Sequence, residues 1–123
     1  MLKVDLHVHT SWSDSKSSVK QVVKAASAKR LDGLAITDHN TLEGAREALR
    51  EAQELLIIPG EEVETWRGEV LALGISEALP KGLDAPEAVD EIHSQGGIAV
   101  APHPTIPLLN TLSISLLRTL PLD

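Results

Sequence analysis

The feature that most constrains the fold is a regular alternation of short apolar segments with longer amphipathic ones. The apolar segments have strand length, and the amphipathic ones carry apolar residues at helical spacing. The predicted strands are residues 3–9, 33–38, 55–59, 70–75 and 98–101, and the predicted helices are 18–30, 42–55, 84 to about 96, and 108–120. Such alternation with apolar strands predicts an α/β protein with a mainly parallel sheet.

Capping residues indicate where three of these helices begin. Ser17 and Thr41 are the expected N-caps of the first two helices. Asp84 and Glu87 bracket Pro86 in a D-x-x-E capping box, which predicts the start of the third.

Length and composition limit the classes of protein that this chain can belong to. Its 123 residues fit one domain with one core, and the absence of cysteine excludes disulfides and thiolate chemistry. Trp12 and Trp66 are the only aromatic residues, and the net charge is −7, so a nucleic-acid binder is not expected. No apolar run has the length of a membrane span and no signal peptide is evident, so the expected location is cytoplasmic.

Two histidines share one face of the first predicted strand. In VDLHVHTSWSD (4–14), apolar residues alternate with Asp5, His7 and His9, and Asp14 follows in the loop. Unpaired polar groups in a core cost free energy, so this face needs partners. His7 and His9 point the same way, about 6.6 Å apart along the strand, close enough to hold one ion.

The chain also repeats a short pattern. GLAITDHNT (33–41) and GIAVAPHPT (97–105) share G-[LI]-A-[IV]-x-x-H-x-T, which places His39 and His103 just past the ends of two predicted strands. Function in α/β folds gathers at the carboxyl ends of strands. One nine-residue match could reflect common strand patterns, but four of the five histidines of the chain lie at such ends, which favours a shared site.

Carboxylates follow the third predicted strand, where PGEEVET contains Glu61 and Glu62. Imidazole and carboxylate groups together suit Zn²⁺, Mn²⁺ or Fe²⁺, and a carboxylate can bridge two ions about 3.5–4 Å apart. A single strand histidine is more often a hydrogen-bonded core residue, so only the combination predicts a metal site. His93, in the middle of a helix, is expected to be structural, and Asp38 to hold its neighbours through hydrogen bonds.

Two other enzyme classes lack their signatures. Ser11 and Ser13 lie near His9, but no G-x-S-x-G elbow is present, and both serines fit a polar turn. No glycine cluster precedes a Lys-Ser/Thr pair, so a phosphate-binding P-loop is also absent.

DLHVHTSWSDS, AITDHNTLEG, IPGEEVET and APHP, in this order, resemble the first motifs of the PHP (polymerase and histidinol phosphatase) superfamily, from residue 3 to about residue 104. The resemblance implies about the first five strands of a distorted (β/α)7 TIM-like barrel. It further implies two or three divalent ions at the carboxyl ends of the strands: Zn, Mn or Fe, with Mg also compatible. The implied reaction is hydrolysis of a phosphoester in a small metabolite or nucleotide.

The same resemblance assigns roles by position. His7 and His9 would bind the first metal, and Glu62 would bridge. Asp14 and His39 would serve a further ion, and His103 would complete the second. The implied catalytic residues are Glu62, His103 and Asp14.

Two departures from the family pattern affect these expectations. Glu69 stands where many relatives have histidine; it could bind metal through oxygen, favouring Mn²⁺ or Mg²⁺, or it could face solvent. The last family motif, a strand-borne Asp-x-His, is absent, so residues 1–123 are expected to be a single, truncated PHP-like domain. An open barrel leaves a strand edge and apolar faces exposed, which favours a homo-oligomer or a complementing chain.

Several alternatives stay open. Arg67, Lys16 or Asn40 could contact the phosphate, and Trp12 is expected mainly to pack. Instead of an enzyme, the chain could be a catalytically incomplete metal-binding or interaction module. An RNA-binding module, similar to the protein subunit of RNase P, is least favoured, because the histidines are retained and the net charge is −7.

Overall fold

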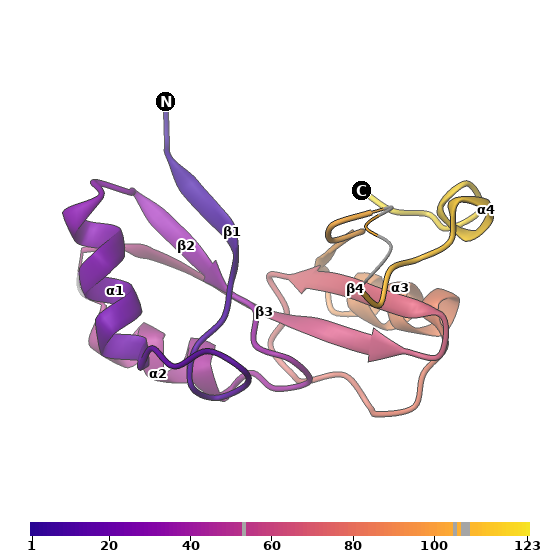
Figure 1. Ribbon diagram of the computed structural model, residues 1–123, viewed down its shortest axis with the longest axis horizontal. Helices are drawn as coiled ribbons and strands as arrows, with labels where there is room; N and C mark the ends of the chain where they lie inside the picture. Colours follow the sequence, from indigo (N-terminus) through magenta and orange to yellow (C-terminus); the bar gives the residue numbers. More distant parts are fainter. Residues whose placement is uncertain (53, 105, 107–108) are drawn as a thin grey trace.

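A computed structural model describes residues 1–52, 54–104, 106 and 109–123. The strands are β1 (Val4–Val8), β2 (Gly33–Ile36), β3 (Leu56–Thr65), β4 (Gly68–Leu73) and β5 (Ile98–Val100), and the helices are α1 (Val19–Ala28), α2 (Glu43–Glu51), α3 (Ala85–Ser94) and α4 (Ile114–Leu117) (Figure 1). Three predictions extend outside the described residues: the helix 42–55 at position 53, the repeat at 105, and the helix 108–120 at its first residue. No helix among the described residues is long and apolar enough to cross a membrane.

The five strands form one sheet in the order β1-β2-β3-β4-β5, which confirms the α/β class. Pairing is parallel from β1 to β3, whereas β4 runs antiparallel to both β3 and β5. The expectation of a mainly parallel sheet is therefore wrong at β4. The reason is the tight connection after Thr65: a parallel return needs about a dozen residues, whereas Gly68, with a φ of 126°, lets the chain reverse at once.

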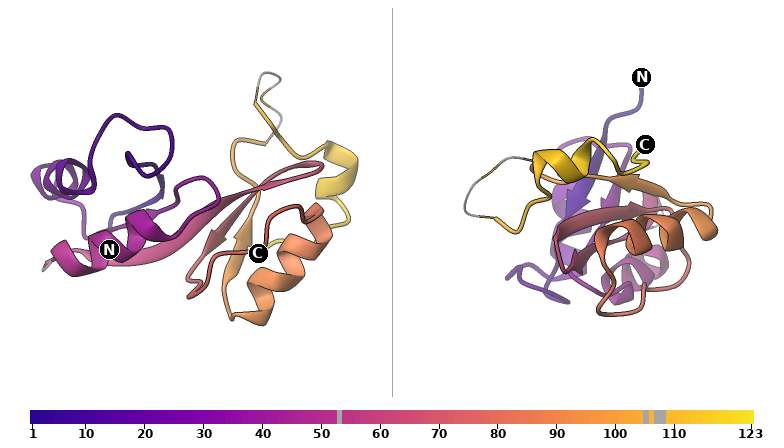
Figure 2. Two further views of the ribbon diagram at one scale, coloured as in Figure 1. Left: turned by 90° about the horizontal axis from the view of Figure 1, so that it is seen from below. Right: turned by 90° about the vertical axis from the view of Figure 1, so that its right-hand side faces the viewer.

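Strand β3 joins two halves of the molecule. Its residues 56–59 pair with β2, and its residues 60–65 pair with β4. Figures 1 and 2 show α1 and α2 in one half and α3 and α4 in the other, with β3 running through both. Each half has its own apolar cluster, built around Leu34, Ile36 and Ala48 in the first and around Val63, Val70 and Ile92 in the second. The junction of the two halves therefore lies within β3.

The helix starts follow the capping chemistry with small shifts. Helix α1 is capped by Ser18, whose side chain accepts from the backbone N–H of Gln21, so the predicted cap was one residue early. The predicted capping box of α3 is confirmed, since Asp84 N donates to Glu87 Oε2 at 2.7 Å. Thr41 accepts from Glu43 N at 3.2 Å, but the N-cap position of α2 is Leu42.

The last helix is much shorter than predicted. Helix α4 has only four residues and begins after Ser113, whose Oγ accepts from Leu116 N at 3.2 Å. Ser113 has the extended backbone of an N-cap, with a ψ of 151°, so the helix cannot continue towards residue 108. Helical spacing alone did not reveal this internal start.

One face of the sheet carries an apolar hollow of about 260 Å³. Leu6, Ile58, Leu73, Ile98 and Val100 contribute to its lining, and Leu6 and Ile98 are 47% and 51% exposed. This confirms the expected exposure of apolar side chains on an open sheet. Self-association through this face stays a prediction, which sedimentation of the purified chain would test.

Alternation along β3 sends Glu61 and Glu62 to opposite faces. Glu61 points into the second half, where it is 1% exposed and its Oε2 accepts from Leu79 N at 3.3 Å. Burial raises the pKa of Glu61 from 4.5 to about 7. The folded protein therefore retains a proton that the unfolded chain releases between these pH values, and stability falls as the pH rises through this window.

We expect Glu61→Gln to stabilise the protein by about 2–3 kcal/mol at about pH 8, because the neutral amide removes the cost of burying a carboxylate. The difference should shrink as the pH falls to about 5, where Glu61 is mostly protonated. Urea denaturation of both proteins at each pH measures it. Glu51→Gln, which removes an exposed carboxyl of α2, controls for the change in net charge. An equal effect of Glu61→Gln at both pH values would contradict the prediction.

Candidate metal centre

All seven predicted metal-site residues line one cavity of about 340 Å³, together with Leu109 and Asn110. The seven are His7, His9, Asp14, His39, Glu62, Glu69 and His103. His7 and His9 come from the end of β1, His39 follows β2, and His103 follows β5. The cavity thus lies where the carboxyl ends of these strands meet, as expected for an α/β fold.

The antiparallel direction of β4 brings Glu69 to this cavity. Glu69 is the second residue of β4, so in a parallel strand it would lie at the opposite edge of the sheet. Because β4 runs in reverse, its amino end meets the carboxyl ends of its neighbours. The side chain of Glu69 is only 10% exposed, so the alternative in which it faces solvent is wrong.

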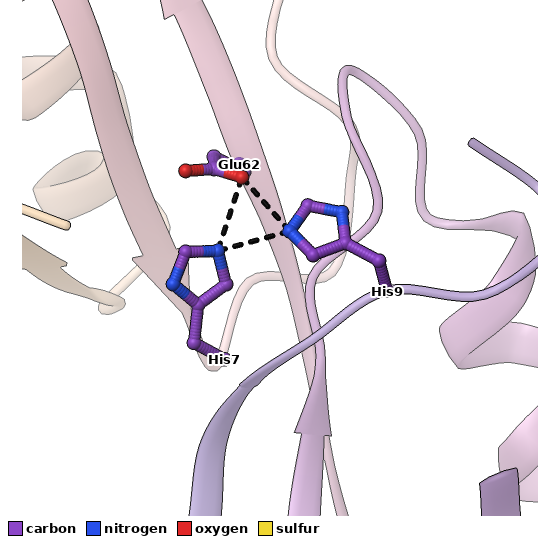
Figure 3. Close-up of side chains that lie close together, drawn as sticks. All are labelled: His7, His9 and Glu62. Atoms are coloured by element: carbon purple, nitrogen blue, oxygen red, sulfur yellow. Dashed lines mark hydrogen bonds and ion pairs between the residues drawn. The ribbon is translucent and has the colours of Figure 1, made fainter. Parts of the chain in front are cut away.

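His7, His9 and Glu62 form the tightest cluster in the cavity. The Nε2 atoms of the two rings lie 3.0 Å apart, and each lies within 3.0 Å of Glu62 Oε2 (Figure 3). Burial alone would raise the pKa of Glu62, but hydrogen bonds from His7 and His9 hold it well below its ordinary value. The hydrogen bond to Glu62 in turn raises the pKa of His9, against the effect of burial.

Glu62 also faces a second set of groups. Its other oxygen, Oε1, lies 2.9 Å from His103 Nε2, and the same nitrogen lies 3.4 Å from Glu69 Oε2. Burial raises the pKa of Glu69, and the negative charge of Glu62 adds to the increase. The two oxygens of one carboxylate thus face two different groups of ligands, which is the arrangement of a bridging ligand.

A third set of groups forms around Asp14. Its two carboxylate oxygens lie 3.3 Å from His9 Nδ1 and 3.4 Å from His39 Nε2. Asp14 is the most exposed of the seven residues, with 66% of its side chain accessible. This set shares His9 with the first cluster, and its His39 also belongs to a fourth set with Glu64 and Glu69, so the four sets are contiguous.

The donor atoms in each set lie within 4.8 Å of one another, close enough to bind one ion. The two imidazole nitrogens and the carboxylate oxygen of the first set lie within 3.0 Å of one another, so a cation bound among them would replace the protons that now join them. A mixture of nitrogen and oxygen donors is what Zn²⁺, Mn²⁺ and Fe²⁺ accept. The residues present therefore fit divalent metal ions.

Sequence reasoning missed Glu64 and Asn110. Glu64 shares a face of β3 with Glu62, and its Oε1 lies 3.7 Å from His39 Nδ1, so strand alternation could have identified it. Asn110 reaches the cavity because Glu69 N donates to its backbone carbonyl at 2.9 Å, and no local sequence signal predicts that contact.

Asp38 and His93 have the supporting contacts expected of them. Asp38 is fully buried and accepts hydrogen bonds from Thr10 N, Thr10 Oγ1 and Ser13 Oγ, each at 2.6 Å. It therefore fastens the loop after β1 beside His39. His93 lies outside the cavity, where its Nε2 is 2.9 Å from Asp123 Oδ2.

The residues expected to contact phosphate are engaged elsewhere or lie outside the cavity lining. Arg67 forms two hydrogen bonds with Asp84, and the side chain of Asn40 bonds to Glu64. Lys16 is not part of the lining. Trp12 donates through Nε1 to Glu47 Oε2 at 2.6 Å, so its ring is anchored against α2.

The sequence matches the PHP domain family over residues 5–94. An uncharacterized protein of Methanocaldococcus jannaschii is 36% identical over 124 residues, which cover 90% of this chain and 72% of that protein. A solved structure from Bifidobacterium adolescentis, provisionally described as a metal-dependent phosphoesterase, has a TM-score of 0.80 at 18% identity, covering 95% of this chain and 73% of the other. This likeness confirms the expected partial barrel.

Two relatives carry names of enzymes that cleave phosphoesters. The phosphoribosyl 1,2-cyclic phosphate 1,2-diphosphodiesterase of Eggerthella lenta is 36% identical over 62% of this chain. The 5'-3' exoribonuclease of Haemophilus influenzae is 36% identical over 64% of it. The matched region spans 32% and 31% of the lengths of these two enzymes.

Proposed function

Since this chain belongs to the PHP domain family, we propose that its histidine and carboxylate cavity is the centre of a metal-dependent phosphoesterase. The observation that carries the proposal is the position of Glu62. Its two oxygens lie within 3.0 Å of histidines from opposite halves of the molecule, His7 and His9 in one and His103 in the other. A buried carboxylate in that position is suited to bridging two ions.

The charge of the cavity supports the need for metal. Asp14, Glu62 and Glu69 place three carboxylates around it, and these would repel a phosphate group. Metal ions bound there would supply positive charge to the phosphate and lower the pKa of water towards neutrality. In this proposal Glu62 would bind the ions of both groups of ligands and so fix their distance from each other. His103, which follows β5, and Asp14, in the loop after β1, would face the phosphoester.

We propose two or three divalent ions, drawn from Zn, Mn and Fe, with Mg also compatible. His7, His9 and Glu62 would hold one ion, and Glu62, Glu69 and His103 a second. His9, Asp14 and His39 would hold a third. The oxygen of Glu69 shifts the second set towards Mn²⁺ or Mg²⁺, because these are harder ions than Zn²⁺.

A small phosphorylated metabolite or nucleotide is the proposed substrate class. A cavity of about 340 Å³ is of the size that encloses a small ligand. The net charge of −7 disfavours a long polyanion. The exoribonuclease relative makes RNA the second candidate, so a short RNA oligonucleotide belongs in the substrate panel.

The test is hydrolysis of p-nitrophenyl phosphate and bis-p-nitrophenyl phosphate with Mn²⁺, Zn²⁺, Fe²⁺ or Mg²⁺ added. We expect turnover that EDTA abolishes and that metal restores. His7→Ala should remove it, whereas His93→Ala, a histidine substitution outside the cavity, should not. Full metal occupancy without turnover on any substrate would refute the enzyme proposal.

The alternative, a catalytically incomplete metal-binding module, predicts a different response to chelation. A structural metal supplies folding free energy, so EDTA would unfold the protein. A catalytic centre in a pre-formed fold would lose activity with a small change in melting temperature. Circular dichroism during the chelation experiment separates the two.

A complementing chain or second copy that completes the centre would appear as activity that rises steeply with protein concentration.

A further inference from the structure

The side chain of Asn40 continues the hydrogen bonding between β2 and β3 at the point where its backbone turns away from the sheet. Beyond β2, His39 forms an isolated parallel bridge with Glu62. Glu62 N donates to the carbonyl of Asp38 at 3.1 Å, and Asn40 N donates to the carbonyl of Glu62 at 3.2 Å. The next bond of a parallel ladder would run from Glu64 N to the backbone carbonyl of Asn40. Asn40, however, has a φ of 52°, which turns the chain towards α2.

The side-chain amide of Asn40 supplies the missing bond. Its Oδ1 accepts from Glu64 N at 3.0 Å, in place of the backbone carbonyl. Its Nδ2 donates to Glu64 Oε2 at 2.9 Å. We call this pair of bonds the Asn40–Glu64 clamp. It holds the end of β3 against the residue that follows His39.

His39 depends on its neighbours for its position. Its Nδ1 is buried and has no hydrogen-bond partner among the described residues. The nearest carboxylate oxygens, on Glu64 and Glu69, lie 3.7 and 3.9 Å away, beyond hydrogen-bond distance. The Nδ1 edge of the ring therefore depends for its position on the backbone on either side of His39, where Asp38 is held by Thr10 and Ser13, and Asn40 by the clamp.

We propose that Asn40 is a positioning residue that fixes His39 relative to Glu62 and thereby sets the affinity of the ion held by His9, Asp14 and His39. This inference rests on the proposed metal centre. Asparagine meets both requirements of the position: it tolerates left-handed backbone, and its amide offers an acceptor and a donor together. Glycine meets only the first requirement. Aspartate would place a second carboxylate against Glu64.

The test is titration of the metal-free protein with Mn²⁺ and Zn²⁺, followed by calorimetry and by metal content per chain. We expect Asn40→Gly to weaken one class of sites ten- to a hundred-fold, the usual effect of losing a group that orients a ligand, and to leave the remaining class unchanged. Arg30→Gly is the matched control, because Arg30 also has a left-handed backbone, with a φ of 55°, in the turn between α1 and β2. It should bind every ion as the wild type does.

Glu64 variants separate the clamp from direct ligation. Glu64→Gln keeps an oxygen for Asn40 Nδ2 and its own backbone N–H, so it should bind metal almost normally. Glu64→Ala keeps only the bond from its backbone N–H to Asn40 Oδ1, so it should weaken the same class of sites less than Asn40→Gly does. Loss of an ion in Glu64→Gln with normal binding in Asn40→Gly would make Glu64 a ligand and overturn the inference. Equal weakening of all sites in Asn40→Gly would also overturn it. If the wild-type protein binds no ion, the proposed function fails; if it does and Asn40→Gly binds equally well, only this inference fails.

Discussion

Glu62→Gln is expected to abolish metal-dependent turnover, with a loss of at least about a thousand-fold in kcat/KM, and to lower the metal content by at least one ion per chain. An amide has one oxygen and one NH₂ group, whereas both oxygens of Glu62 face histidines at 2.9–3.0 Å. Either way round, the NH₂ of glutamine faces one set of ligands and cannot bind a cation.

The matched control is Glu61→Gln, which makes the same change one residue earlier on the opposite face of β3. It should keep its metal and its turnover, because Glu61 points into the core beside Leu79. Metal content by mass spectrometry and initial rates with a phosphoester measure both variants. A Glu62→Gln protein with two bound ions and unchanged kcat/KM would show that Glu62 does not bridge.

Gly44→Ala is expected to destabilise the fold by about 3 kcal/mol, although alanine is the better helix former by about 1 kcal/mol. A Cβ on Gly44 would lie 2.1 Å from Asp38 Oδ2 and 2.8 Å from Thr10 Oγ1. The first turn of α2 would have to move away, or Asp38 would lose its hydrogen bonds to the loop after β1. Steric overlap therefore outweighs helix propensity at this position.

Urea denaturation and metal content measure the effect of Gly44→Ala. Because Asp38 precedes His39, we expect weaker metal binding together with the lower stability. Glu51→Ala, on the exposed end of the same helix, controls for substitution by alanine in α2 and should change the stability little. A midpoint equal to or above that of the wild type would show that the contact relaxes without cost.

Much of the candidate site could be predicted because its signals are local. Strand alternation places His7 and His9 on one face, and the repeated pattern places His39 and His103 beyond two strand ends. These relationships need only the period of a strand and the direction of a sheet.

The rest depended on contacts between distant segments. Glu69 lies at the cavity only because the chain reverses at Gly68. From the sequence alone Asn40 was a candidate to contact phosphate, whereas in the fold its side chain bonds to Glu64. Asn110 reached the cavity through a backbone bond to Glu69 N. Sequence periodicity contains no information on such pairings, since they are decided by how whole elements pack.

Because β3 runs through both halves of the molecule, ions bound at its centre would add a second link between those halves. The chain has no cysteine and so no disulfide, and among the described residues β3 is the one strand that pairs in both halves. Ions held between His7 and His103 would close a chain loop that runs from residue 7 to residue 103. They would lower the conformational entropy of the unfolded chain, as a long-range disulfide does. The residues that bind the ions would then also raise the free energy of unfolding.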